Sequence, residues 1–551
     1  MATTQHWTEQ VAEQIERRVL ADKGAGATIV CASGISPSGP IHLGNMREEM
    51  TVHLVAEALR ERGHMTEHIH SWDDFDRLRK VPKGVPDAFA QYIGMPLCDI
   101  PDPFGEYGSY AERHIAEFTA SMDQLGIRPR YVRQSIAYRR GDYIEGVKKA
   151  MALREKIFDF LAEHQTLGTR EESVEERRAG YYPFKFYCAS CRTDATQIVA
   201  YDAATAQGEY ACAKCGHRAA FDLNQPADGK LVWKVDWPMR WHHERVDFEP
   251  AGEDHSAPGS SFTVGKQIVS AIYGSKAPHF IGYTFVGMGG RSKISSSAGT
   301  SAVPRAALDI LEPGILRWLY LRRQPNQKFD IDFGNEVLRL YDEWDRLAQN
   351  VAAGKASETE RYTYEHCMRT STDAIAQTEL RESFRLLSSV ADITQGNTEQ
   401  ILRIVAAHGG HDEPLDQLKA KLEPRLSCAW RWISEYLPED ERTTIRGEFA
   451  AEAFAALPEQ HQQGLRMLVE QLDESWTPDG LTGLIYGIPK DLLGYPRDVK
   501  PNEELKQFQR AFFISLYNLL CASETGPRLP TLFLSLGQER VRSLLVPPAA
   551  A

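Results

Sequence analysis

A glycine-containing loop between a strand-like run and a helix-like run limits the fold of this chain more than any other feature. Residues 28–32 are apolar and partly β-branched, and apolar residues recur at helical spacing over 50–59, before Gly63. A second strand-like run follows at 67–71. This order of strand, loop, helix and strand predicts a parallel α/β sheet near the N-terminus.

The loop covers residues 37–45 and reads PSGPIHLGN. Phosphates bind where a parallel strand gives way to a helix, because the N–H groups and the dipole of the helix point at them there. We expect Gly39 to allow a tight turn, Gly44 to let a flat base approach the helix, and His42 to donate to phosphate oxygens. Alone, the loop could equally be an ordinary connection with a surface histidine.

A second loop, residues 289–297, reads GGRSKISSS and contains Lys293. A glycine-flanked loop with a lysine and hydroxyls can close on a triphosphate as charge develops. Serine-rich loops are common linkers, so this loop is a weak indication by itself. It becomes more specific beside the first loop, because the two flank the same predicted sheet domain.

Four of the nine cysteines form two CxxC pairs separated by twenty residues. This spacing predicts a zinc ribbon, and a site closed by four thiolates is structural rather than catalytic. The other five cysteines are scattered, which is typical of a reducing compartment and not of a disulfide framework. The predicted zinc ligands are Cys188, Cys191, Cys212 and Cys215.

Composition indicates a multidomain globular protein. A chain of 551 residues is too long for one hydrophobic core. It shows no signal sequence and no apolar stretch of transmembrane length, so we expect a cytoplasmic protein without a membrane partner. The net charge of −13 argues against an unspecific polyanion binder, although a local basic face would suffice for nucleic acid. The candidate face, which could also be an ordinary solvated surface, holds Arg128, Arg130, Arg133, Arg139, Arg140, Lys148 and Lys149.

The two loops together resemble the signatures of class I aminoacyl-tRNA synthetases. Residues 37–45 are similar to the HIGH motif and residues 293–297 to the KMSKS motif, with Asn45, Ile294 and Ser296 as substitutions. Several segments resemble the class I lysyl-tRNA synthetases more narrowly, and a serine in place of the second loop lysine is frequent there. These segments are 34–39 with 47–49, 72–76, 100–105, 235–241 and 249–255.

Two positions depart from that family. Glu253 stands where lysine is usual, and Thr284 stands where glutamate is usual. Both lie near the implied amino-acid pocket, so they bear on the strength and breadth of lysine binding.

The resemblance implies a Rossmann-type parallel-sheet catalytic domain with a zinc-ribbon insertion, followed by a mostly α-helical C-terminal domain. We expect the catalytic domain in two halves, 1–95 and 231–290, around an insertion at 96–230. Residues 291–355 would hold the second loop and a connecting helical region. Residues 356–551 would form an α-helical anticodon-binding domain.

The implied activity is that of an ATP-dependent lysine–tRNA ligase, a monomer that forms lysyl-adenylate and charges tRNA(Lys), with Mg²⁺ accompanying ATP. His42 and Lys293 are the implied catalytic residues. The implied ATP-binding residues are Pro37, Gly39, His42, Gly44, Asn45, Lys293, Ser295 and Ser296. The implied lysine-binding residues are Gly34, Ser36, Glu48, Trp237, His255 and Tyr283.

Alternatives from two other classes stay open at the level of sequence. A cysteinyl-type synthetase would place a zinc ligand in the amino-acid pocket, and a glutamyl type needs a pocket arginine, for which Arg47 and Arg240 are the local candidates. A non-enzymatic zinc-ribbon protein that binds nucleic acid is the third alternative. The presence of both His42 and Lys293 argues against it.

Overall fold

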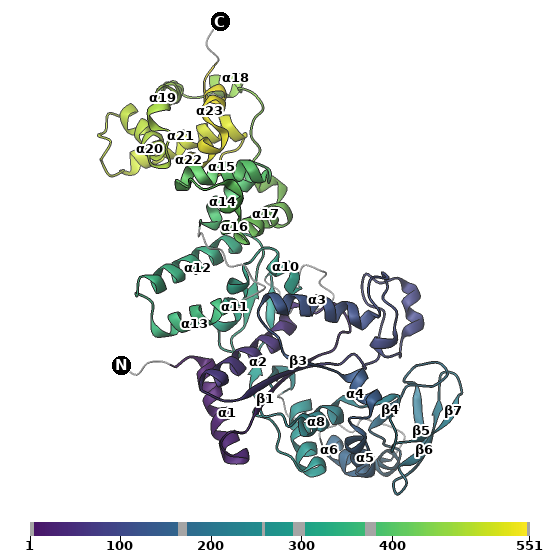
Figure 1. The fold of residues 1–551 in the computed structure, drawn as a ribbon. Coiled ribbons are helices and arrows are strands. Elements are labelled where there is room, and N and C mark those ends of the chain that lie inside the picture. Colours follow the sequence, from purple (N-terminus) through teal and green to yellow (C-terminus); the bar gives the residue numbers. More distant parts are fainter. Residues whose placement is uncertain (1–4, 164–172, 256–258, 290–302, 370–381, 548–551) are drawn as a thin grey trace. The chain divides into compact units, whose positions relative to one another are not determined.

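The computed structural model describes residues 5–163, 173–255, 259–289, 303–369 and 382–547 (Figure 1). It divides into two compact units, which we describe separately. The first comprises residues 1–308, 313–332 and 350–375, and the second comprises residues 309–312, 333–349 and 376–551. Within the described ranges, no helix is long and apolar enough to cross a membrane.

A parallel sheet begins the first unit. Strands β1 (Ile29–Ile35), β2 (Thr66–Trp72) and β3 (Arg130–Arg133) lie side by side in this order, all parallel. The helix α2 (Leu43–Glu61) joins β1 to β2, and α1 (Trp7–Lys23) packs against it. The strands and helix predicted at 28–71 are therefore confirmed and are longer than predicted.

Further parallel strands flank β1 on its other side. Phe248 forms parallel bridges with Cys31 of β1 and with His279. The two segments continue into β9 (Ala251–Gly252) and β10 (Gly282–Tyr283), which pair in parallel. Successive parallel segments therefore run away from β1 in both directions across the sheet, which makes the edge beside β1 a topological switch point.

Apart from β3, the residues between β2 and residue 231 form helices and two small antiparallel sheets. One sheet pairs β4 (Phe184–Phe186) with β8 (Gly229–Leu231), and the other has the order β5-β6-β7. These three strands are Thr196–Asp202, Gln207–Cys212 and Arg218–Asp222. The helices are α3 (Tyr110–Gln124), α4 (Gln134–Arg140), α5 (Ile144–Ala152), α6 (Arg154–Ala162) and α7 (Val174–Ala179).

Residues 233–235 are helical, although the run 231–235 has a strand-like composition. The strand β8 ends at Leu231, and α8 (Trp233–Glu244) begins two residues later. The run is apolar and β-branched enough to suit a strand, but Trp237 and Trp241 further along are spaced i, i+4. A helix places both indoles on one buried face, and this tertiary burial overrides the local preference.

The remainder of the first unit continues from α8. It contains α9 (Ser261–Ile268) and the parallel pair β11 (Val286–Met288) and β12 (Phe329–Ile331). Its other helices are α10 (Pro304–Leu308), α11 (Pro313–Leu321) and α13 (Glu358–Met368).

The second unit is helical, and no strand occurs among its described residues, in line with the mostly α-helical C-terminal region that the resemblance implies. Helix α15 (Thr398–Gly409) has Asn397 as its N-cap and Gly410 in the left-handed conformation at its end. The other helices are α12 (Glu336–Ala352, all but its last turn), α14 (Phe384–Ile393), α16 (Leu415–Leu422), α17 (Arg425–Tyr436), α18 (Ala451–Ala455), α19 (Glu459–Glu470), α20 (Pro478–Leu492), α21 (Glu503–Cys521), α22 (Leu529–Leu536) and α23 (Gln538–Leu545).

A fully buried arginine joins three segments of the second unit. The guanidinium of Arg425 donates to Glu312 (2.6 Å) and forms two hydrogen bonds to Asp345 (2.8 and 2.9 Å). Such a buried pair adds little net stability over an apolar core, but removing one partner leaves uncompensated charge behind.

We predict that Arg425→Met lowers the free energy of unfolding of the second unit by about 3–5 kcal/mol, because Glu312 and Asp345 lose their cation. Urea unfolding followed by circular dichroism would measure this. The matched control on the same helix is Arg431→Met, which breaks an exposed i, i+4 pair with Glu435 and should cost only about 0.3–0.5 kcal/mol. Equal losses in the two variants would contradict the role given to Arg425.

Candidate active site

The first loop leaves β1 at the carboxyl edge of the parallel sheet, beside the switch point. It reaches His42, which is the N-cap of α2. The Nδ1 atom of His42 accepts from the backbone N–H of Asn45 (3.3 Å), and Asn45 Oδ1 accepts from the backbone N–H of His42 (3.3 Å). An Nδ1 that accepts puts the ring hydrogen on Nε2 of the neutral imidazole. His42 therefore has the tautomer whose Nε2–H can donate to a phosphate oxygen at the start of the helix.

The structure explains why a glycine stands at position 44, and the explanation differs from the one that the sequence suggested. A Cβ atom on Gly44 would lie 2.8 Å from His42 Nδ1 and 2.9 Å from His42 Cε1. The space above Gly44 is therefore occupied by the His42 ring, whereas the sequence suggested an approaching adenine. Any side chain at this position would displace the imidazole.

The middle of the loop is held by α3. The hydroxyl of Tyr110 donates to the carbonyl of Ser38 (3.1 Å), and Gly39 lies beside the same hydroxyl. Pro37 is buried. This contact fixes the loop that the sequence assigns to ATP binding.

Glu48 lies one turn further along α2 and connects three elements. Its Oε1 accepts from the backbone N–H of Gly34 in β1 (2.8 Å), and its Oε2 accepts from the hydroxyl of Tyr283 in β10 (2.7 Å). Burial raises the pKa of Glu48 to about 8, although both hydrogen bonds oppose the rise. The structure therefore brings three of the predicted lysine-binding residues together around one carboxyl group.

Trp237 and His255 form a second group of predicted pocket residues. Their rings contact edge to face, with centroids 5.9 Å apart. Trp237 is 4% exposed, and its indole N–H donates to Glu249 (2.9 Å). Ser36 directly follows β1 and is half-buried.

Sequence reasoning missed Glu249 as a candidate site residue. Its second carboxylate oxygen accepts from the indole N–H of Trp241 (2.7 Å). Two tryptophans spaced i, i+4 were the available signal, because a buried indole N–H needs an acceptor.

Both arginines near the pocket are buried and bonded to other groups of the chain through part of the guanidinium. Arg47 is buried, and its Nη2 donates to the carbonyls of Gln324 and Pro325 (both 2.8 Å). Arg240 is paired with Asp73 (3.0 Å) and Asp236 (3.3 Å). These hydrogen bonds and ion pairs argue against a pocket of the glutamyl type, which needs an arginine for the substrate carboxylate.

Comparison with known proteins agrees with this geometry. The family model described as "tRNA synthetases class I (K)" matches residues 5–372. A lysine–tRNA ligase of Streptomyces coelicolor is 43% identical to this chain, and the alignment covers 98% of each. The enzymes of that name from Pyrococcus horikoshii (97% of this chain, 98% of its own length) and Treponema pallidum (98% of each) are 33% and 32% identical.

The chain belongs to the class I lysyl-tRNA synthetase family. Membership decides against the glutamyl and cysteinyl types and against a non-enzymatic zinc-ribbon protein. It also gives the chain the class I synthetase fold, with mixed α/β content and a helical majority.

Thr284 and Glu253, the two residues that differ from the usual family sequence, differ in burial. Thr284 is buried and donates twice to the carbonyl of Pro325, from its backbone N–H (2.9 Å) and from its hydroxyl (3.4 Å). Glu253 is exposed, in the short turn Glu253–His255. The Thr284 hydroxyl is therefore engaged by the same carbonyl that holds Arg47.

The second signature loop of the synthetase falls largely outside the described residues. Lys293, Ser295 and Ser296 all belong to the range 290–302, so their assigned roles rest on sequence. The described part ends at Gly289, whose backbone N–H donates to the carbonyl of Ile331 (3.3 Å).

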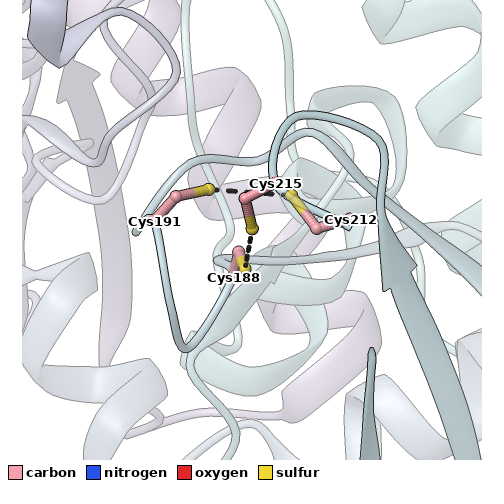
Figure 2. A group of neighbouring side chains, drawn as sticks. All are labelled: Cys188, Cys191, Cys212 and Cys215. Atoms are coloured by element: carbon pink, nitrogen blue, oxygen red, sulfur yellow. Dashed lines mark hydrogen bonds between the residues drawn. The ribbon is translucent and has the colours of Figure 1, made fainter. Parts of the chain in front are cut away.

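The four paired cysteines converge at the tips of two turns (Figure 2). Their sulfur atoms all lie within 4.8 Å of one another. The Sγ atoms of Cys188 and Cys215 are 3.6 Å apart, as are those of Cys191 and Cys212. Four sulfurs at tetrahedral positions about 2.3 Å from a zinc ion are about 3.8 Å apart, so the cluster fits Zn²⁺. His217 is not part of the group.

The candidate basic face is largely neutralised by carboxylates of the chain itself. Its seven residues are spread over β3, α4, α5 and the segments beside them. Six of them pair with acidic side chains, and Arg130, Arg133 and Arg139 have two acidic partners each. This favours the interpretation as an ordinary solvated surface.

We predict that the purified synthetase holds one zinc ion per chain and that Cys191→Ser loses it, because the site needs all four thiolates. Elemental analysis of protein prepared without chelator would measure the metal. Cys98→Ser, at a half-buried cysteine outside the cluster, should keep its zinc. Protein without zinc, or a Cys191→Ser variant that retains it, would contradict the prediction.

Proposed function

We propose that this chain is an ATP-dependent lysine–tRNA ligase, which activates lysine as lysyl-adenylate and transfers it to the 3′ end of tRNA(Lys). The observation that carries the proposal is the Glu48 carboxyl group, bound by Gly34 and Tyr283 at the switch point of the sheet. A half-buried carboxylate is the natural partner of a lysine ε-ammonium. The lysine–tRNA ligases that align over nearly the whole chain support the same substrate.

The chemistry needs no nucleophile from the protein. The lysine carboxylate attacks the α-phosphate of ATP and expels pyrophosphate, and the terminal ribose hydroxyl of tRNA then attacks the adenylate carbonyl. Catalysis is therefore positioning plus stabilisation of phosphate charge. In the proposal, His42 donates from Nε2 and Lys293 supplies a cation, and Mg²⁺ bound with ATP offsets phosphate charge. The further ATP contacts in the proposal are Pro37, Gly39, Asn45, Ser295 and Ser296, and Gly44 makes room for the His42 ring.

Lysine lies in this proposal between the two groups of pocket residues. Glu48 and Tyr283 bind the ε-ammonium, and the flat rings of Trp237 and His255 line the aliphatic stem. Gly34 and Ser36 provide backbone and hydroxyl contacts at the end of β1. The position of Glu48 in the second turn of α2, with both oxygens bonded to other elements, supports a pocket role over a helix-dipole role.

The proposed domain arrangement follows the sequence. Residues 1–95 and 231–290 form a Rossmann-type catalytic domain around an insertion at 96–230 with a structural zinc, although β3 of the main sheet also lies within that range. Residues 291–355 hold the second loop and connecting helices, and 356–551 form an anticodon-binding domain. We propose a cytoplasmic monomer.

We predict that lysine gives the fastest ATP–pyrophosphate exchange among the twenty amino acids, tested with and without tRNA, and that His42→Ala slows it about a hundredfold. Because His42 also caps α2, His42→Asn is the matched control, since asparagine is a good N-cap without the imidazole donor. It should keep the thermal stability of the wild type and still lose the exchange activity. A different best substrate would overturn the lysine assignment, and full activity in both variants would overturn the role of His42.

We predict that the KM for lysine falls as the pH rises toward 8 and levels off above it. The ammonium binds to an ionised Glu48, and the pKa of Glu48 is raised to about 8 in the free protein, so binding below that pH must first remove a proton.

Glu48→Gln should raise the KM for lysine at least about tenfold, because the ammonium is left without its counter-charge. It should flatten the pH profile and leave the KM for ATP nearly fixed. Glu145→Gln, at an exposed carboxylate of α5 outside the proposed pocket, should keep the wild-type profile, and a Glu48→Gln variant that also keeps it would contradict the assignment.

A further inference from the structure

Two indole N–H groups converge on one buried carboxylate beside the proposed lysine pocket. Trp237 donates to Glu249 Oε1 (2.9 Å) and Trp241 donates to Glu249 Oε2 (2.7 Å). The two tryptophans lie one turn apart on α8, with ring centroids 4.7 Å apart. Glu249 belongs to the segment beside β1, two residues before β9. The carboxylate therefore fixes α8 against the strand segment that borders the switch point.

The ring of Trp237 is enclosed on several sides as well as hydrogen-bonded. Trp233 stacks on it at 5.2 Å, Phe262 contacts it at 6.1 Å and His255 contacts it edge to face. Trp241 is also closely packed. Its ring lies so near Gly265 that a Cβ atom at this glycine would be 2.9 Å from it. Packing sets the plane of the Trp237 ring, and the bond to Glu249 decides which edge of the indole points toward the sheet.

Glu249 also lies in the electrostatic surroundings of the pocket. The negative charges of Glu249 and Glu49 both raise the pKa of Glu48 on α2. The hydrogen bonds from Gly34 and Tyr283 lower it. Facing Glu249 itself are Arg240 on α8 and Asp73 at the end of β2. Burial raises the pKa of Glu249, and the two indole donors and Arg240 oppose the rise.

We propose that Glu249 is a positioning residue for lysine recognition, which orients the Trp237 wall of the pocket and adds its negative charge to that of Glu48 around the ε-ammonium. This inference rests on the proposed lysine–tRNA ligase function. Glu249 acts through Trp237 and Glu48, and it needs no contact with the reacting atoms.

The geometry explains why a carboxylate is required at this position. Both oxygens accept a hydrogen bond from an indole, and tryptophan can only donate. A glutamine would offer one acceptor and turn its NH₂ group toward the other indole, so one buried donor would lose its partner. An aspartate would keep the charge, but its shorter side chain cannot reach both indoles from the same backbone position.

These two substitutions separate the two parts of the proposal. Glu249→Gln has nearly the same size but removes the charge and one of the two acceptors. The KM for lysine should rise roughly tenfold, the scale of one buried donor left unpaired. The pH at which lysine binding levels off should move down, because Glu48 loses a negative neighbour. Glu249→Asp should also raise the KM for lysine but keep the wild-type inflection. In both variants the KM for ATP should stay nearly unchanged.

Indole N–H resonances in ¹⁵N-labelled protein give a readout that needs no substrate. The signals of Trp237 and Trp241 can be assigned with Trp237→Phe and Trp241→Phe, and both should shift in Glu249→Gln while the other indole signals stay in place. If these two signals stay unshifted, or if lysine KM and its pH profile match the wild type in Glu249→Gln, the inference is overturned. A wild-type protein that fails to activate lysine would overturn the proposed function instead, and the indole signals would still show whether Glu249 orients Trp237.

Discussion

Charges buried at the carboxyl edge of the parallel sheet hold the site region together. Asp73 directly follows β2, and it pairs with Lys230 of β8 (3.2 Å) and with Arg240 of α8 (3.0 Å). Lys230 also binds Asp76 (2.7 Å), and Asp236 accepts from Tyr138 of α4. The network joins the sheet, the small antiparallel sheets and α8 at one place. Buried ion pairs of this kind add little net stability, but they specify one arrangement, since any other leaves a charge unpaired.

The first two turns of α2 carry both halves of the proposed chemistry. His42 caps the helix and, in the proposal, donates from Nε2 to the phosphates, and Glu48 lies between β1 and β10. A single rigid helix therefore sets the distance between the phosphate-binding group and the ammonium-binding group. For a reaction without a protein nucleophile, this distance matters more than the reactivity of any one side chain.

Much of the site could be predicted because its signals are local. The HLGN sequence at the start of α2 predicted a helix N-terminus, and the structure shows His42 and Asn45 capping each other there. The CxxC spacing predicted the cluster of four cysteines. Other features could not be predicted, because they depend on neighbours distant in the chain. Gly44 accommodates the His42 ring, Arg47 is held by carbonyls of Gln324 and Pro325, and the acidic partners of the basic residues at 128–149 are scattered over residues 67–244.

The sequence alone determined the class of the protein, the start of the parallel sheet, the cysteine cluster and the helical nature of the C-terminal half, since each has a short-range pattern of spacing or periodicity. Tertiary structure alone decided which charged and aromatic groups meet. The strand-like run after Leu231 is part of helix α8 because its apolar face is buried there. The side chain of Glu249 accepts hydrogen bonds from two indoles, and burial raises the pKa of Glu48. The physical reason is that burial and pairing depend on atoms brought together from different parts of the chain, and no local window of sequence contains them.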